Sequence, residues 1–154
     1  MKQFIVFGLG EEDFGIDIKN VVEILKYQKV RGLPNLPDFI SGIITVRGDV
    51  IALIDMRKRF GIRFSQSKNE RIILIRAEGE KVGLVVDAVR EIASFSNEEM
   101  TLPPAIFKGL KTEYLEGIAK KKGSVVILLS IESLLSAEEK IILKESTETA
   151  IVET

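Results

Sequence analysis

The sequence predicts a mainly β protein made of two similar halves, folded as small β-barrels or as a β-sandwich. Short apolar segments recur roughly every 8–12 residues, and glycine-containing turns separate them, which is typical of such folds. The second half of the chain also repeats the first. With 154 residues, of which 45% are hydrophobic and 29% are charged, the chain is long enough to bury an ordinary core.

The internal repeat consists of two aligned blocks. Residues 2–24 align with residues 70–92, and residues 40–60 align with residues 115–135. Glycines that mark turns and bends coincide in both blocks, including Gly15 with Gly83 and Gly48 with Gly123. Because the glycines at turns and bends match as well as the apolar pattern, we interpret the two blocks as two copies of one structural unit.

The repeat sets the expected limits of the domain. We expect one domain over residues 3–145, with repeat halves at approximately 2–69 and 70–137. A capping box at Ser136-Ala137-Glu138-Glu139 predicts a C-terminal helix that continues to Lys144. The polar residues 146–154 are expected to form a flexible tail.

Each half is predicted to contain two strands, a single helical turn, an irregular proline-marked stretch and a hairpin. In the first half these are Phe4–Leu9, Phe14–Ile18, a turn capped by Asp17 that ends near Glu23-Ile24, Leu33-Pro34 to Pro37, and Gly42–Val46 with Val50–Ile54. In the second half they are Arg71–Arg76, Val82–Val86, a turn capped by Asp87 that ends near Glu91-Ile92, Leu102-Pro103-Pro104, and Gly117–Lys121 with Val125–Leu129. Glycine in the hairpin turns Arg47-Gly48-Asp49 and Lys122-Gly123-Ser124 supplies the positive φ that tight turns require.

Composition narrows the classes of function. The chain has no Cys, His or Trp. It therefore offers no disulfide, thiolate nucleophile, imidazole base, zinc thiolate site or HExxH metal site, which argues against an enzyme. We predict no cofactor and no metal. Lys plus Arg is 22 and Asp plus Glu is 23, so there is no basic field for nucleic-acid phosphates. No apolar run reaches the roughly 18 residues of a membrane span, and we expect a cytoplasmic protein.

Three aspartates follow apolar strands, at Asp17, Asp55 and Asp87. As catalytic carboxylates they would have to converge in one cleft. As caps of turns and short helices they need no further partner. We therefore interpret them as caps and predict no catalytic residue.

Three features have no obvious role in the fold. Arg47 occupies a turn that needs glycine but does not need arginine, so it is either a solvated charge or a guanidinium that binds a partner. The segment around Glu23 has a mixed apolar and acidic character, and it serves either core packing or a contact surface. The stretch from Leu102 to Phe107 is apolar but has the period of neither strand nor helix, so its side chains are either tucked into the core or presented to a partner.

Several short segments in a fixed order extend over nearly the whole chain, from about Phe4 to about Glu145. They are Phe4-Ile5-Val6-Phe7, Phe14-Gly15-Ile16-Asp17-Ile18, Val21-Val22-Glu23-Ile24, Leu33-Pro34 with Pro37, Ile40-Ser41-Gly42-Ile43, Val46-Arg47-Gly48-Asp49-Val50-Ile51, Leu53-Ile54-Asp55-Met56-Arg57, Val82-Gly83-Leu84-Val85-Val86-Asp87, Glu113-Tyr114-Leu115-Glu116-Gly117-Ile118 and Val126-Ile127-Leu128-Leu129. In this order and spacing they resemble the CheW family of bacterial chemotaxis coupling proteins. Lys121-Lys122 departs from the apolar-Arg pattern of the first hairpin, so the two turns need not share a role.

The resemblance implies a fold, a mechanism and a set of contact residues. The fold would be two SH3-like five-stranded β-barrels, with the first strand possibly exchanged into the second barrel. Such proteins are non-enzymatic adaptors that bind the regulatory domain of the histidine kinase CheA and the cytoplasmic hairpin tips of chemoreceptors. Matched by position, the partner-binding residues are Val21, Glu23, Ile24, Gly42 and Arg47 in the first barrel, and Leu102 and Phe107 in a kinase-facing loop of the second.

Two other functions remain open from the sequence. Within the family, the chain could couple receptors to another CheA-type pathway, such as one for twitching motility. Outside it, a small β-barrel could bind nucleic acid, but that would need a basic face and stacking aromatics, and the chain has two Tyr and no Trp.

Overall fold

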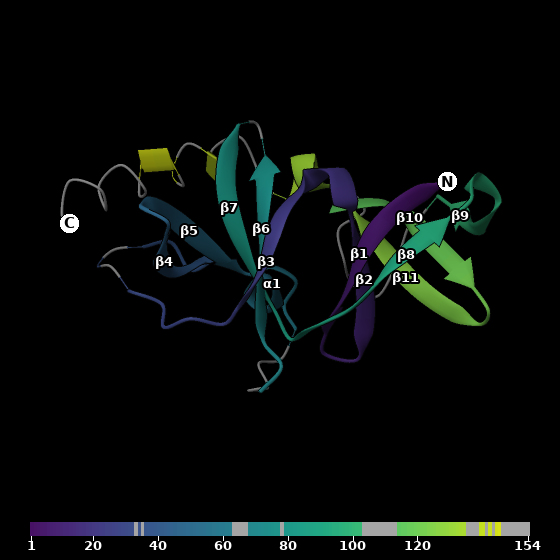
Figure 1. Cartoon of the computed structure of the whole chain (residues 1–154), viewed down its shortest axis with the longest axis horizontal. Helices are drawn as coiled ribbons and strands as arrows, with labels where there is room; N and C mark the ends of the chain where they lie inside the picture. Colours follow the sequence, from purple (N-terminus) through teal and green to yellow (C-terminus); the bar gives the residue numbers. More distant parts are fainter. Residues whose placement is uncertain are drawn as a thin grey trace.

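The computed structural model describes residues 1–32, 34, 36–62, 68–77, 79–102, 114–134, 139–140, 142 and 144–145. Its strands form two sheets that lie side by side (Figure 1). The sheet on the left of Figure 1, which we call the five-stranded subdomain, contains β3 (Val21–Lys26), β4 (Ile40–Val46), β5 (Asp49–Asp55), β6 (Arg71–Ala77) and β7 (Glu80–Val86). The sheet on the right, the six-stranded subdomain, contains β1 (Lys2–Leu9), β2 (Glu12–Asp17), β8 (Ala88–Phe95), β9 (Met100–Thr101), β10 (Leu115–Lys121) and β11 (Ser124–Leu129). The predicted mainly β fold is confirmed.

The helical elements are short. Among the described residues they include the 3-10 turns η1 (Ile18–Asn20), η2 (Asn97–Glu99) and η4 (Ile131–Ser133) and the four-residue helix α1 (Met56–Arg59). Near the C-terminus, residues 139–140, 142 and 144–145 are helical, as the sequence predicted for that segment. Ser136, Ala137 and Glu138 of the predicted capping box lie outside the described residues.

In each sheet, the first hairpin of one half of the chain pairs with strands from the other half. The strand orders are β3-β6-β7-β5-β4 and β8-β1-β2-β11-β10-β9. Strand β2 pairs in parallel with β11, and β7 pairs in parallel with β5. The first hairpin of each repeat thus completes the sheet of the other repeat. The resemblance implies a possible exchange of the first strand alone. In the structure both strands of each first hairpin are exchanged, β1 with β2 and β6 with β7.

Among the described residues, three apolar clusters form the core. One lies within the five-stranded subdomain and includes Ile72 and Leu74, and one lies within the six-stranded subdomain and includes Phe4 and Val6. The largest cluster lies between the two sheets. It contains the residues of β1 and β6 that alternate with those of the first two clusters, among them Ile5, Phe7, Ile73 and Ile75. Because side chains alternate along a strand, both faces of β1 and β6 are buried. This burial explains why their sequences are continuously apolar rather than alternating.

The predicted helical turns after the second and seventh strands are partly wrong. Asp17 does cap a turn, since its carboxylate accepts from the backbone N–H of Lys19 at 3.0 Å. The turn ends at Asn20, however, and Glu23 lies in β3. Asp87 is followed directly by β8. Both segments pair with apolar strands, and β3 is also rich in β-branched residues, which favours strand over helix.

The two hairpin turns have matching backbones. Arg47 and Gly48 have φ of 48° and 85°, and Lys122 and Gly123 have φ of 51° and 82°. Positive φ at both central residues is the mark of a type I′ turn, whose twist suits a hairpin. The sequence predicted this for glycine alone. Arg47 and Lys122 thus adopt a conformation that is uncommon for residues other than glycine.

Candidate functional site

Two of the predicted contact residues meet in the structure. The Arg47 guanidinium in the β4–β5 turn donates through Nη2 to Glu23 Oε1 of β3 at 2.8 Å. The side chain of Arg47 is 68% exposed and that of Glu23 is 28% exposed. A surface ion pair of this kind adds little to stability, and most of the guanidinium is free to bind another group. Glu23 thereby orients Arg47 on the surface.

Strand β3 presents apolar side chains to solvent beside this ion pair. Val22 is 39% exposed and Ile24 is 40% exposed, while Tyr27 just beyond the strand is 47% exposed. Val21 and Leu25 are partly buried and pack against the central cluster and the five-stranded cluster respectively, on opposite faces of the sheet. β3 lies at the end of its sheet, so its outer face and edge are natural docking features.

Gly42 has a role in the backbone of the same subdomain. Its φ is 151°, and a Cβ added there would lie 2.4 Å from the carbonyl oxygen of Arg31. Next to it, Ile43 and Arg31 exchange two backbone hydrogen bonds of 2.9 Å. Gly42 therefore allows the segment before β4 to lie against that strand, a role that needs no partner protein.

Leu102 lies in the other subdomain, directly after β9. It is 86% exposed. It borders a hollow of about 220 Å³ that is lined by Lys2, Phe4, Met100, Thr101, Leu102, Glu116, Gly117 and Leu128. An exposed leucine at the rim of a partly apolar hollow is suited to contact with a protein partner. Phe107, the other residue predicted for this face, lies outside the described residues.

The predicted contact residues therefore fall into two separate groups. Val21, Glu23, Ile24, Gly42 and Arg47 belong to the five-stranded subdomain, and Leu102 belongs to the six-stranded one. We call the first the β3 face, a name that takes in both sides of this edge strand and is defined by Val22, Glu23, Ile24 and Arg47. We call the second the Leu102 face, defined by Leu102 and the hollow that it borders.

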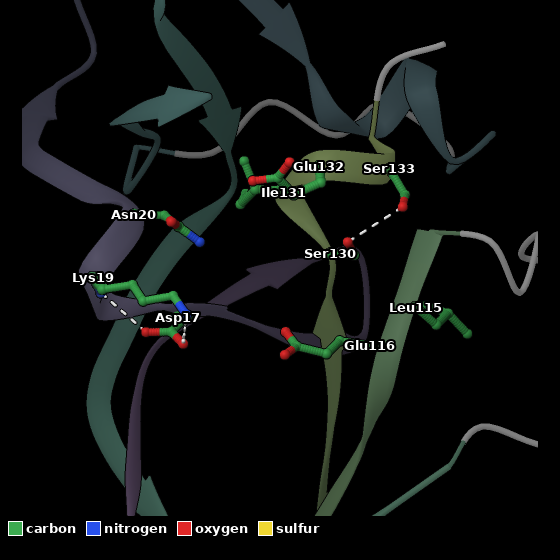
Figure 2. A pocket seen from close by; sticks show the side chains of 9 residues that line it. All are labelled: Asp17, Lys19, Asn20, Leu115, Glu116, Ser130, Ile131, Glu132 and Ser133. Atoms are coloured by element: carbon green, nitrogen blue, oxygen red, sulfur yellow. Dashed lines mark hydrogen bonds and ion pairs between the residues drawn. The ribbon is translucent and has the colours of Figure 1, made fainter. Parts of the chain in front are cut away.

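A polar pocket of about 270 Å³ lies between η1, the start of β10 and η4 (Figure 2). Its lining includes the carboxylates of Asp17, Glu116 and Glu132, and Asp17 also pairs with Lys19 at 3.6 Å. Figure 2 shows that the carboxylates come from three different elements and that a hydrogen bond joins Ser130 to Ser133. Within the part of the chain that the structure describes, no group of three or more His, Cys, Asp or Glu could hold a metal ion.

Arg57 is a buried charge that the sequence reasoning missed. Its side chain is only 3% exposed, and it pairs with Asp55, Glu70 and Asp87 at 3.2, 3.5 and 3.2 Å. Burial lowers the pKa of the guanidinium, but the hydrogen bond that it donates to Asp55 and the three negative charges outweigh burial and raise its pKa. The predicted cap at Asp55 is confirmed, since its carboxylate accepts from the backbone N–H groups of Arg57 and Lys58.

The turn that leads to Leu102 contains a carboxylate with a lowered pKa. The backbone N–H of Ser96 donates to Glu99 Oε1 at 2.9 Å, and this hydrogen bond lowers the pKa of Glu99. A lowered pKa in the folded state adds stability above the unfolded pKa, and that stability is lost as the pH falls through the folded value. We expect the Glu99 carboxyl to titrate below the usual value of about 4.3 when followed by NMR. A midpoint at or above that value would contradict the hydrogen-bonded turn.

Among the described residues, no helix is long and apolar enough to cross a membrane.

Comparison with known proteins places these features in a family. The chain is a small β protein of two subdomains with an exposed apolar group on each. The chain belongs to the family of CheW-like domains, which matches residues 3–139. It is 38% identical over 139 residues to the chemotaxis protein CheW of Klebsiella aerogenes, covering 90% of this chain and 84% of that protein. It is 34% identical over 142 residues to CheW of Treponema pallidum, covering 89% and 84%.

A solved structure supports the same assignment. The scaffolding protein TtCheW of Thermoanaerobacter tengcongensis superimposes with a TM-score of 0.83 at 38% sequence identity, covering 90% of each chain. The predicted membership in the CheW family and the pair of SH3-like subdomains are confirmed.

Proposed function

We propose that this chain is a chemotaxis adaptor that couples a CheA-type histidine kinase to the cytoplasmic hairpin tips of chemoreceptors. Membership in the CheW family supports a coupling role. The observation that carries the two-partner function is the separation of the β3 face and the Leu102 face, which lie on different subdomains. An adaptor needs two surfaces that can be occupied at once.

The β3 face is proposed as the receptor-docking surface. A receptor hairpin tip is helical, and a helix docks with an apolar stripe and flanking charges. Val22 and Ile24 would supply the apolar contact, and Arg47, held by Glu23, would pair with a carboxylate of the helix. Val21 packs against the central cluster, and Gly42 allows the segment at Val30 and Arg31 to lie against β4.

The Leu102 face is proposed as the kinase-docking surface. Leu102 would act as an apolar anchor for the regulatory domain of the kinase, and Phe107, which lies outside the described residues, is proposed as a second anchor. Reversible interfaces of modest area depend on a few such anchors, so the loss of one should be measurable.

Titration calorimetry with each isolated partner tests this assignment. Leu102→Ser is expected to weaken binding of the kinase regulatory domain by at least about tenfold and to leave receptor binding unchanged. Ile24→Ser should produce the opposite pattern. Both positions are on the surface, so the two variants serve as matched controls for each other. If both variants lose the same partner, the division into two faces is wrong.

Failure of the wild-type protein to bind either partner from the same cell would favour a CheA-type pathway other than chemotaxis. Salt-sensitive binding of RNA in place of either protein would favour the nucleic-acid alternative.

A further inference from the structure

The chain crosses between the two subdomains in two places among the described strands. The first crossing is η1, between β2 and β3, and the second is the single residue Asp87, between β7 and β8. Both crossings lie next to the central apolar cluster, since Ile16 before the first crossing and Val86 before the second belong to it. The relative orientation of the subdomains therefore depends on what holds these crossings in place.

The carboxylate of Asp87 makes one bond to each subdomain. Its Oδ2 accepts from the backbone N–H of Gly10 at 2.7 Å, in the β1–β2 turn of the six-stranded subdomain. Its Oδ1 accepts from Arg57 Nη1 at 3.2 Å, in α1 of the five-stranded subdomain. The backbone N–H of Asp87 also donates to the carbonyl of Gly8 at 3.0 Å. Asp87 is only 9% exposed, so water competes weakly for these bonds.

Arg57 is held rigidly on its own side of this bridge. Its Nε and Nη2 donate to the two carboxylate oxygens of Asp55 at 3.2 and 3.3 Å, and Nη2 also lies 3.5 Å from Glu70 Oε2. A planar guanidinium that is held by two carboxylates can donate a hydrogen bond to a third carboxylate only in a narrow range of directions. The direction of the Arg57–Asp87 bond is therefore set by the five-stranded subdomain.

A further polar contact between the subdomains near α1 is the hydrogen bond that Arg59 Nη1 donates to the Tyr114 hydroxyl at 3.4 Å. The aromatic contacts there have weaker directional preferences. Phe60, which follows α1, stacks on Phe14 of β2 at 5.5 Å between ring centroids and tilts against Tyr114 at 5.8 Å. Such contacts, like the central apolar cluster, stabilise association but tolerate small changes of angle. A buried network of charged hydrogen bonds is satisfied in far fewer arrangements.

We propose that Arg57 and Asp87 form a clamp that fixes the angle between the two subdomains. The consequence for function, which rests on the adaptor role proposed above, is that the clamp sets the geometry between the β3 face and the Leu102 face. Arg57 and Asp87 are then positioning residues, because they touch neither partner. They act by holding the two docking faces in one relative orientation.

The clamp can be tested by measuring the distance between spin labels placed on the two subdomains. The chain has no Cys, so labels at Thr45→Cys in β4 and Lys120→Cys in β10, both exposed, report on the two sheets without background. Asp87→Asn keeps a side-chain oxygen as acceptor but removes the charge that Arg57 binds. We expect one narrow distance distribution for the wild-type protein and a broadened or shifted one for Asp87→Asn.

The matched control is Asp49→Asn, which removes an exposed Asp–Lys pair of 3.3 Å within the five-stranded subdomain. It should leave the distribution unchanged. A distribution for Asp87→Asn that is as narrow as that of the wild type, at the same mean distance, would overturn the clamp even if the variant melts at a lower temperature. This measurement does not involve partner binding. Failure of the clamp is therefore distinguishable from failure of the proposed adaptor function.

A second measurement needs no variant and covers the case in which Asp87→Asn does not fold. Gly10 lies in an exposed turn, where a backbone amide normally exchanges quickly with solvent. The clamp predicts that the Gly10 amide exchanges slowly, because Asp87 holds it. Fast exchange of the Gly10 amide in the wild-type protein would overturn the proposal.

Discussion

Replacing Arg47 by Asp is expected to abolish receptor coupling while the protein still unfolds cooperatively at nearly the same temperature. The guanidinium is mostly exposed, so its loss removes no core packing. At φ of 48°, aspartate is tolerated at least as well as arginine, because its short side chain suits the left-handed region. The new carboxylate would face Glu23 and any acidic group of the partner. Its electrostatic interaction with both would change from attractive to repulsive.

Two measurements check this expectation. Titration calorimetry with a receptor hairpin tip should show binding weakened by at least about tenfold, while the unfolding temperature changes by no more than about 2 °C. Lys122→Asp is the matched control, since it makes the same charge reversal at the corresponding turn position, with φ of 51°. Receptor binding should survive in that control. Loss of the cooperative transition in Arg47→Asp would show instead that Arg47 is structural.

Replacing Gly42 by Ala is expected to lower the free energy of unfolding by at least about 2 kcal/mol, because backbone strain and steric overlap add together. The added Cβ would lie 2.4 Å from the Arg31 carbonyl oxygen and 2.5 Å from Val30 Cγ1. Both distances are well below van der Waals contact, so the segment before β4 must move away. The two hydrogen bonds between Arg31 and Ile43 would then be strained or lost. Urea denaturation measures the change.

Gly79→Ala separates the two contributions. Gly79 has φ of 82° but nothing within 4 Å of an added Cβ, so that variant reports backbone strain alone, roughly 1 kcal/mol. If Gly42→Ala costs no more than Gly79→Ala, the close approach to Arg31 is not a constraint. If Gly42→Ala is stable but loses its partner, Gly42 acts through binding rather than through the fold.

The strands next to glycine turns were predictable from the sequence, because their signals are local. The hairpin around Arg47-Gly48 was placed within one or two residues of its observed limits. β3 was not, because a six-residue segment with Glu23 among valines and isoleucine has no decisive period. Its pairing with β6, which lies far away in the sequence, decides its state.

The exchange of hairpins and the Arg57 network could not be predicted for a related reason. The first strands of the two repeats have similar apolar patterns, so either could complete either sheet. The carboxylates around Arg57 come from positions 55, 70 and 87, and only the exchanged topology brings them together. Arg47 and Glu23 were singled out separately, but nothing in the sequence indicated that they form one ion pair.

The most direct test of the adaptor function is to ask whether both partners bind the chain at once. We would mix the protein with the kinase regulatory domain and a receptor hairpin tip and measure the mass of the complex by analytical ultracentrifugation. The separation of the β3 face and the Leu102 face predicts a ternary complex, with each partner binding equally well whether or not the other is present. Competition between the two partners, with only binary complexes at saturating concentrations, would contradict an adaptor with two independent faces.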